Sequence, residues 1–231
     1  MKALLALLFA GKLGKILLSG GSMLVSVVVY AQMFGWKYAV GFVLLLLCHE
    51  MGHYIAAKQR GLDVGLPTFI PFVGAWISLK NQRLNPETEA FVGLAGPLLG
   101  STGAFVVYLI ALQYQTHWLL AVAYAGFVLN LFNLIPVVPL DGGHIVAVIT
   151  PKLWIVGIPL LVALYLWRPS PLLIIIAVLA LPKAWAAIRG KLPQPAELQL
   201  ATNVLKARYA AEYLGLIGFL TLMAFEVHSL V

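Results

Sequence analysis

The chain has 231 residues, of which 62% are hydrophobic and 10% are charged. Soluble domains carry about 25% charged residues, so the 8 acids and 15 bases are too few to cover a soluble fold of this length. The hydrophobicity also excludes a disordered chain, and the single cysteine, Cys48, excludes an intrachain disulfide and a cysteine-rich metal site. We therefore expect an all-α polytopic membrane protein.

The first expected element is a short helix at residues 1–14. Lys2 precedes an apolar run, as in a signal peptide, but no convincing small-residue cleavage site follows, and Lys12 and Lys15 come directly after the run. We therefore interpret this segment as a helix lying in the membrane interface rather than as a cleaved signal.

Seven apolar runs follow, separated by proline, glycine or polar residues. A transmembrane helix needs roughly 20 apolar residues, so we expect six to seven transmembrane helices. The fifth run contains Gly157 and Pro159, which predict a kink, and Glu212 near the start of the last run leaves open whether it spans fully. The expected spans are Ile16–Phe34, Trp36–Ala57, Pro86–Leu112, His117–Val138, Lys152–Trp167, Pro171–Ile188 and Val204–Val227.

The stretch 61–85, between the second and third spans, is apolar but too rich in proline and glycine for a helix. Its aromatic and β-branched residues favour short extended segments, and such backbone can enter a membrane only where protein or a cavity covers it. We predict a short re-entrant β-like loop here, and an ordinary interfacial loop is the alternative. Asn85, Pro86 and Glu87 then predict a capped helix start.

The positive charges predict the orientation. With a cytoplasmic N-terminus and alternating spans, only Lys37 and Arg168 fall outside, as the positive-inside rule favours. The scattered bases are therefore topology anchors, and they do not indicate nucleic-acid binding. The inner side holds Lys2, Lys12, Lys15, Lys58, Arg60, Lys80, Arg83, Lys152, Lys183, Arg189, Lys191, Lys206 and Arg208, which are thirteen of the fifteen bases.

The second span contains an H-E-x-x-H motif, His49-Glu50-Met51-Gly52-His53. On a helix, positions i and i+4 share one face, so the two imidazoles can bind one zinc ion while Glu50 acts on the attacking water. Ionisable residues at membrane depth are costly and mark functional sites. The alternative is a polar helix end that only makes hydrogen bonds, which leaves the spacing unexplained.

A catalytic zinc usually has three protein ligands, so a third ligand must come from elsewhere. Asp141 is the other outstanding acid in an apolar setting, within N-L-I-P-V-V-P-L-D-G-G at 133–143. The prolines and glycines break the helix there. The second and fourth spans both end on the cytoplasmic side, so His53 and Asp141 can approach each other. The alternative is that Asp141 only caps the following helix.

His49–His53, the segment Gly93-Leu-Ala-Gly-Pro97, and Asn133-x-x-Pro136-x-x-x-x-Asp141-Gly together resemble the site-2 protease family of intramembrane zinc metalloproteases, peptidase family M50. The resemblance implies one zinc ion per chain held by His49, His53 and Asp141, with Glu50 as the catalytic acid/base.

The resemblance also implies a domain organisation. The catalytic core at residues 36–143 would be a three-helix unit with the re-entrant loop at 61–85, followed by C-terminal helices at 152–231. Residues 1–231 would form a single integral membrane metalloprotease domain, without the PDZ or CBS domains that many relatives carry. We expect this compact form in a prokaryotic inner membrane, with the active site nearer the cytoplasmic side.

The expected reaction is hydrolysis of peptide bonds within single-span transmembrane proteins, as in regulated intramembrane proteolysis. Zinc would supply Lewis acidity, and Glu50 would serve as general base and then general acid. The resemblance assigns Asn133 to substrate binding. We also expect the loop residues Phe72, Gly74 and Trp76 to hold an unwound substrate by strand addition, and we consider His144 a candidate for orienting a ligand.

Two other functions remain as alternatives. A membrane metal-ion transporter would distribute ionisable residues over several helices and matching halves, whereas these concentrate at one site. A non-catalytic relative that binds membrane segments would not need Glu50. The expected partners are the lipid bilayer and membrane-protein substrates, and a homo-oligomer is left open.

Overall fold

The computed structural model describes residues 12–72, 74–76, 85–189 and 202–231. Most of the interfacial helix expected at 1–14 lies outside these residues, as do residues 77–84 of the expected loop and the bases Lys2, Lys80, Arg83 and Lys191. The helices are α2 (Lys12–Phe34), α3 (Trp36–Gln59), α4 (Pro86–Tyr114), α5 (His117–Asn133), α6 (Asp141–Ile149), the 3₁₀ turn η1 (Pro151–Leu153), α7 (Trp154–Trp167), α8 (Pro171–Ile188) and α10 (Asn203–His228).

The membrane character of the chain is confirmed by its helices. Five of the described helices are long and apolar enough to cross a bilayer: α2 from Ile16, and α3, α4, α8 and α10. Two apolar segments, α5 and Pro151–Trp167, are shorter. The protein is therefore an integral membrane protein built almost entirely from helices, while the count of six to seven spans stays a prediction.

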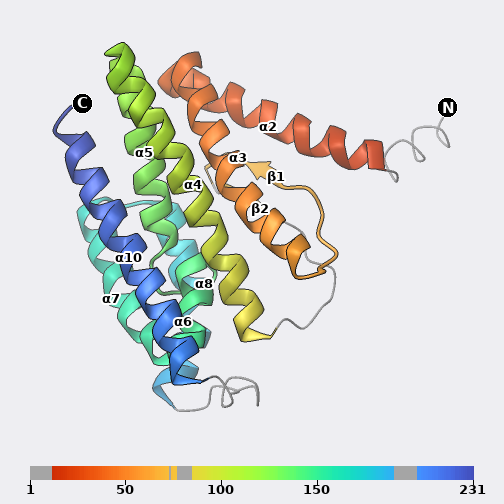
Figure 1. Cartoon of the computed structure of the whole chain (residues 1–231), viewed down its shortest axis with the longest axis vertical. Helices are drawn as coiled ribbons and strands as arrows, with labels where there is room; N and C mark the ends of the chain where they lie inside the picture. Colours follow the sequence, from red (N-terminus) through yellow and green to blue (C-terminus); the bar gives the residue numbers. More distant parts are fainter. Residues whose placement is uncertain (1–11, 73, 77–84, 190–201) are drawn as a thin grey trace.

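The bundle is organised around α4. Helices α3, α5, α6 and α10 all contact it, and α7 packs against α8 beside them. Figure 1 shows α3, α4, α5 and α10 with similar long-axis directions, whereas α2 leaves the bundle obliquely. The main apolar core lies among α4, α5, α6 and α10 and includes the fully buried Phe127 and Ile145.

The predicted start of the third span is confirmed. The Oδ1 of Asn85 accepts a hydrogen bond from the backbone N–H of Thr88 at 2.7 Å, and Pro86 occupies the first turn of α4. Glu87 and Glu89 also lie in that turn, where carboxylates favour the positive end of the helix dipole.

The expected extended loop contains a β-hairpin. Strand β1 (Thr68–Ile70) pairs antiparallel with β2 (Gly74–Trp76), with Thr68 opposite Trp76 and Ile70 opposite Gly74. Phe72 and Gly74 adopt positive φ angles of 65° and 119°, which the turn between the strands requires.

The outer edge of β1 is covered by α2. Ser19 Oγ donates a hydrogen bond to the carbonyl oxygen of Pro67 at 2.6 Å. The N–H of Phe69 donates to Ser22 Oγ at 3.0 Å, and the N–H of Phe72 donates to Tyr30 Oη at 2.9 Å. Main-chain groups that cannot reach water inside a membrane need hydrogen-bond partners. Hydroxyl groups of α2 therefore make the hydrogen bonds that a neighbouring strand would otherwise make.

Candidate metal centre

The two histidines of the motif face each other on α3. Residues four apart lie one turn apart on the same side of a helix, and the ring centroids of His49 and His53 are 4.8 Å apart. Their Nε2 atoms approach to 3.1 Å. The predicted convergence of the two imidazoles is therefore present in the structure.

Neighbouring helices determine which ring nitrogen carries the hydrogen. His53 Nδ1 lies 2.8 Å from the carbonyl oxygen of Val92 on α4, and His49 Nδ1 lies 2.8 Å from Asn130 Oδ1 on α5. The Nδ2 of Asn130 donates to the carbonyl oxygen of Gly126 at 2.7 Å, which turns its Oδ1 toward His49. Both acceptors lack a hydrogen, so each Nδ1 donates. When both imidazoles are neutral, their two Nε2 atoms therefore present lone pairs to each other.

Asp141 completes this group from α6. Its carboxylate lies 3.2 Å from His49 Nε2 and 3.3 Å from His53 Nε2. The ligand atoms of these three residues all lie within 4.8 Å of one another. Ligands on a tetrahedral zinc at its usual bond lengths are about 3.3 Å apart, so the separations match that donor set.

One carboxylate oxygen of Asp141 lacks a hydrogen-bond partner in the described part of the chain. Asp141 Oδ2 is buried and has no hydrogen-bond partner among the described residues, although His49 Nε2 lies 3.2 Å from it. Two lone pairs and an orphaned carboxylate oxygen aimed at one point are costly in a buried site, and a divalent cation satisfies all three. The residues present therefore fit zinc, with two nitrogens and one oxygen and room for a further ligand.

The structure does not support the alternative in which Asp141 only caps its helix. The cap position of α6 is Leu140, and Asp141 is the first residue inside the helix, with no capping hydrogen bond from a side chain. The carboxylate turns toward the histidines instead.

Glu50 lies beside the three candidate ligands. It precedes His53 by three residues, which places both on neighbouring positions of α3, and it is only 7% exposed. Among the described residues, none forms a hydrogen bond with its carboxylate. A buried acid held next to a candidate metal site without a structural partner is available to accept a proton.

Glycines on α4 allow the helices to come close enough to form the site. A Cβ atom at Gly96 would collide with the imidazole of His53, and one at Gly100 would collide with the side chain of Asn130. On α3, a Cβ at Gly52 would collide with the backbone of Ala95. These glycines therefore set the distance between α3, α4 and α5 at the level of the candidate ligands.

The segment that presents Asp141 is held from two further helices. Gly142 packs against the carbonyl groups of Leu134 and Ile135, where a Cβ would not fit. Trp154 Nε1 donates to the carbonyl oxygen of Gly143 at 2.8 Å, and the hydroxyl of Tyr213 donates to that of Leu134. Contacts from α7 and α10 thus fix the break between α5 and α6.

Two other predicted residues form their hydrogen bonds with groups other than the candidate ligands. Asn133 Nδ2 donates to the carbonyl oxygen of Leu129 in its own helix at 3.2 Å. His144 Nδ1 lies 3.2 Å from Glu89 Oε2, so the pair joins α6 to the first turn of α4. The structure does not show either residue orienting a ligand.

The hairpin packs on α2 through β1 and contacts α3 through β2. Phe72 is 52% exposed and packs edge-on against Tyr30 at 5.4 Å between ring centroids. Gly74 begins β2, and Trp76 ends it and is described by its backbone pairing with Thr68.

Sequence reasoning missed Asn130. It is completely buried and hydrogen-bonds His49, yet its partner lies 81 residues away in the chain. The signal was an amide within the otherwise apolar run of α5, because polar side chains at membrane depth need partners.

The sequence matches peptidase family M50 over residues 37–117 and 114–155, which contain all of the candidate ligands and Glu50. The zinc metalloprotease MJ0392 of Methanocaldococcus jannaschii is 29% identical over 123 residues, which are 50% of this chain and 35% of that protein. A second protein of the same organism, MJ0611, whose name places it among the zinc metalloproteases, is 37% identical over 135 residues, 49% of this chain and 70% of the relative.

Among solved structures, the site-2 protease from Methanocaldococcus jannaschii is similar, with a TM-score of 0.45 and 21% sequence identity over 75% of this chain and 88% of that one. The match to MJ0392 spans about a third of that relative's length. The family match covers more than half of the chain, and its residues include the group just described. This chain belongs to peptidase family M50.

Proposed function

We propose that the protein is a zinc-dependent intramembrane endopeptidase that cuts transmembrane segments of other membrane proteins. The observation that carries the proposal is the convergence of the Nε2 atoms of two histidines and the carboxylate of Asp141 beside Glu50. His49, His53 and Asp141 would hold the metal. Zinc, when bound, supplies Lewis acidity that polarises a peptide carbonyl and makes water easier to deprotonate.

The chain's own residues would carry the proton. Glu50 takes a proton from the attacking water and gives it to the leaving amide nitrogen, acting as general base and then as general acid. Asn130 keeps the hydrogen of His49 on Nδ1 and therefore keeps Nε2 free for the metal. Val92 does the same for His53 through its main-chain carbonyl.

The depth of the site determines the kind of substrate. His53 lies six residues before the end of α3, or about 9 Å at the helical rise, so the cut falls inside a membrane-spanning bundle. A single-span substrate helix must unwind locally before its peptide bonds can react, because its amides are already hydrogen-bonded.

The unwound segment would add to the hairpin as a strand. Hydroxyls of α2 take the outer side of β1, so we place the added strand on the side of β2, from Gly74 to Trp76. Phe72, exposed at the turn, would contact its side chains, and Asn133 would hydrogen-bond its backbone.

The orientation follows from the bases. Arg60 at the end of α3 lies 3.4 Å from Glu87 at the start of α4, and the hydroxyl of Tyr209 near the start of α10 reaches the carbonyl oxygen of Glu87. The positive-inside rule supports a cytoplasmic position for this end; the site would then lie nearer to the cytoplasm, and we propose a prokaryotic inner membrane as the location.

The decisive experiment compares wild type with Glu50→Gln and Asp141→Ala. Zinc per chain and cleavage of a reconstituted single-span protein are measured for each. We expect near-stoichiometric zinc in wild type and Glu50→Gln, cleavage only in wild type, and loss of zinc in Asp141→Ala. Equal cleavage by Glu50→Gln would remove it from the mechanism, and zinc flux into liposomes would favour the transporter.

A further inference from the structure

A groove lies between α4 and α10, away from the candidate metal centre. Its volume is about 630 Å³. Leu98 of α4 lines the groove. Gly96, two residues earlier on the same helix, packs against the ring of His53. At 100° per residue the two project about 200° apart on α4, so the groove and the metal site occupy opposite sides of this helix. The proposed peptidase chemistry does not use it.

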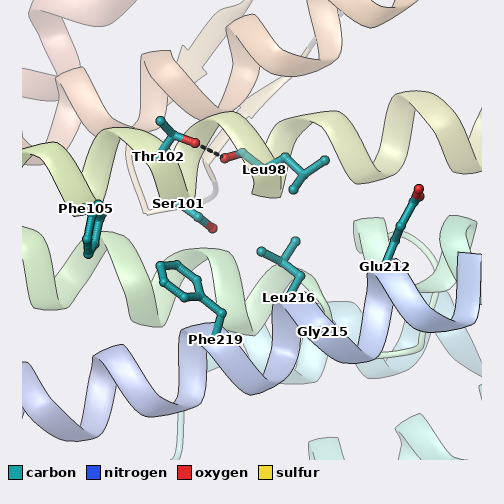
Figure 2. A pocket seen from close by; sticks show the side chains of 8 residues that line it. All are labelled: Leu98, Ser101, Thr102, Phe105, Glu212, Gly215, Leu216 and Phe219. Atoms are coloured by element: carbon teal, nitrogen blue, oxygen red, sulfur yellow. Dashed lines mark hydrogen bonds between the residues drawn. The ribbon is translucent and has the colours of Figure 1, made fainter.

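The walls of the groove need no hydrogen-bonding partner. Figure 2 shows Leu98 and Phe105 of α4 facing Leu216 and Phe219 of α10. The two hydroxyls between them are satisfied within α4, since Ser101 Oγ donates to the carbonyl oxygen of Pro97 and Thr102 Oγ1 donates to that of Leu98 at 2.9 Å. An occupant made of hydrocarbon therefore loses nothing by entering.

The width of the groove selects among apolar occupants. At one end the rings of Phe105 and Phe219 approach to 6.0 Å between centroids. A helix is about 10–12 Å across with its side chains, so it could rest on the groove but not fill it. An alkyl chain is narrow enough to lie along the floor.

The other end carries charge. Glu212 lines the groove there, and the Nε of Arg208, one turn earlier on α10, donates to its carboxylate at 2.8 Å. Arg208 is mostly exposed, and its terminal guanidinium nitrogens have no partner among the described residues. Lys206 lies in the same turns of the helix. A phosphate is the natural ligand of such a guanidinium.

We infer that this groove binds one phospholipid with an anionic headgroup, its acyl chain between α4 and α10 and its phosphate at Arg208. The lipid completes the contact between these two helices along the groove, and so supports the side of α4 that faces away from the metal centre. The arrangement places the headgroup at the end of the bundle that the other bases share.

Gly215 offers the sharpest test. It lines the groove, and a Cβ atom added there meets no atom within 4 Å. Gly218, on the same helix, also has open space around it but does not line the groove. Leucine at position 215 fills the groove, whereas leucine at 218 adds the same bulk outside it.

The full chain in detergent is titrated with dioleoyl phosphatidylglycerol or phosphatidylcholine, and bound lipid is counted by native mass spectrometry. We expect one tightly retained phosphatidylglycerol in wild type and in Gly218→Leu, and affinity lower by about tenfold in Gly215→Leu. Arg208→Gln should abolish the preference for phosphatidylglycerol over phosphatidylcholine. Thr102→Phe, which fills the groove from α4, repeats the test from the other wall.

Zinc content shows that each variant is folded, so the result does not depend on peptidase activity. Equal lipid retention in Gly215→Leu, Thr102→Phe and Gly218→Leu would overturn the inference. A dimer that dissociates in Gly215→Leu, without retained lipid in wild type, would also overturn it and assign the groove to a helix of a second copy.

Discussion

The candidate metal centre and the hairpin both place polar groups within the membrane-spanning part of the chain, but they are held in different ways. The candidate ligands are enclosed by α3, α4, α5 and α6, and close-packed glycines such as Gly96 fix the distances. In the hairpin, Phe69 packs among residues of α2 and α3, but the outer main-chain groups are held by one helix, α2, through single hydroxyl contacts such as that of Ser22. Groups enclosed by packing have one position, whereas groups held by a few hydrogen bonds can move at modest cost.

The difference fits the two tasks that we propose. A metal site at His49, His53 and Asp141 would need fixed geometry, because ligand distances tolerate little change. Substrate handling at the hairpin would have to accept segments of differing sequence, and an oblique helix tied by hydroxyls could adjust to them (Figure 1). Substitutions should therefore affect zinc in the first region and cleavage alone in the second.

The largest effect is expected for Gly96→Ala. The added Cβ would collide with the His53 ring, whereas the Cβ of Gly93→Ala would meet Asp141 and His144 at an ordinary 3.4 Å. We expect Gly96→Ala to lose most of its zinc and its cleavage, and Gly93→Ala to keep both. Elemental analysis of the purified proteins measures this. If both variants hold zinc equally, close packing is not what positions His53.

A smaller effect is expected for Asn130→Leu, which removes the acceptor for His49 Nδ1. Loss of such an outer hydrogen bond typically weakens metal binding by about 10–100-fold. Competition with a chelator measures the zinc affinity. Asn133→Leu is the matched control, because among the described residues the side chain of Asn133 bonds only within its own helix. Equal affinities for the two variants would contradict a positioning role for Asn130.

The smallest effect is expected at the hairpin. Ser22→Ala leaves the N–H of Phe69 without its acceptor, a cost of about 1–3 kcal/mol. Ser26→Ala removes a buried hydroxyl from the same helix that has no partner among the described residues. We expect slower substrate cleavage in Ser22→Ala only, with zinc unchanged in both. The cleavage rate and the zinc content of each variant are measured in parallel. A loss of zinc in Ser22→Ala would contradict the proposed difference between the two regions.

The parts of the site that follow local rules could be predicted from the sequence. His49 and His53 converge because helical spacing alone brings them together, and the cap at Asn85 is equally local. Asp141 could be predicted because an acid in a broken apolar segment stands out, although it lies 88 residues beyond His53.

Other features depend on which surfaces meet. Asn130 bonds a histidine on another helix, and no spacing rule connects the two. The hydroxyls of Ser19, Ser22 and Tyr30 bond main-chain groups. Because every residue has such groups, the sequence does not indicate which of them a hydroxyl will bond. The groove at Gly215 exists because α10 packs more closely on α5 than on α4, and composition does not reveal this.

The closure of β1 by α2 also bears on how copies of this protein meet in a crowded membrane. A bare strand edge is a template that can recruit an identical edge from another molecule and begin aggregation. With Ser19 and Ser22 bonded to main-chain groups of Pro67 and Phe69, that route to self-association is blocked on the β1 side of the hairpin. The same hydroxyls therefore leave the β2 side as the place where a strand of a substrate or of a second copy would pair.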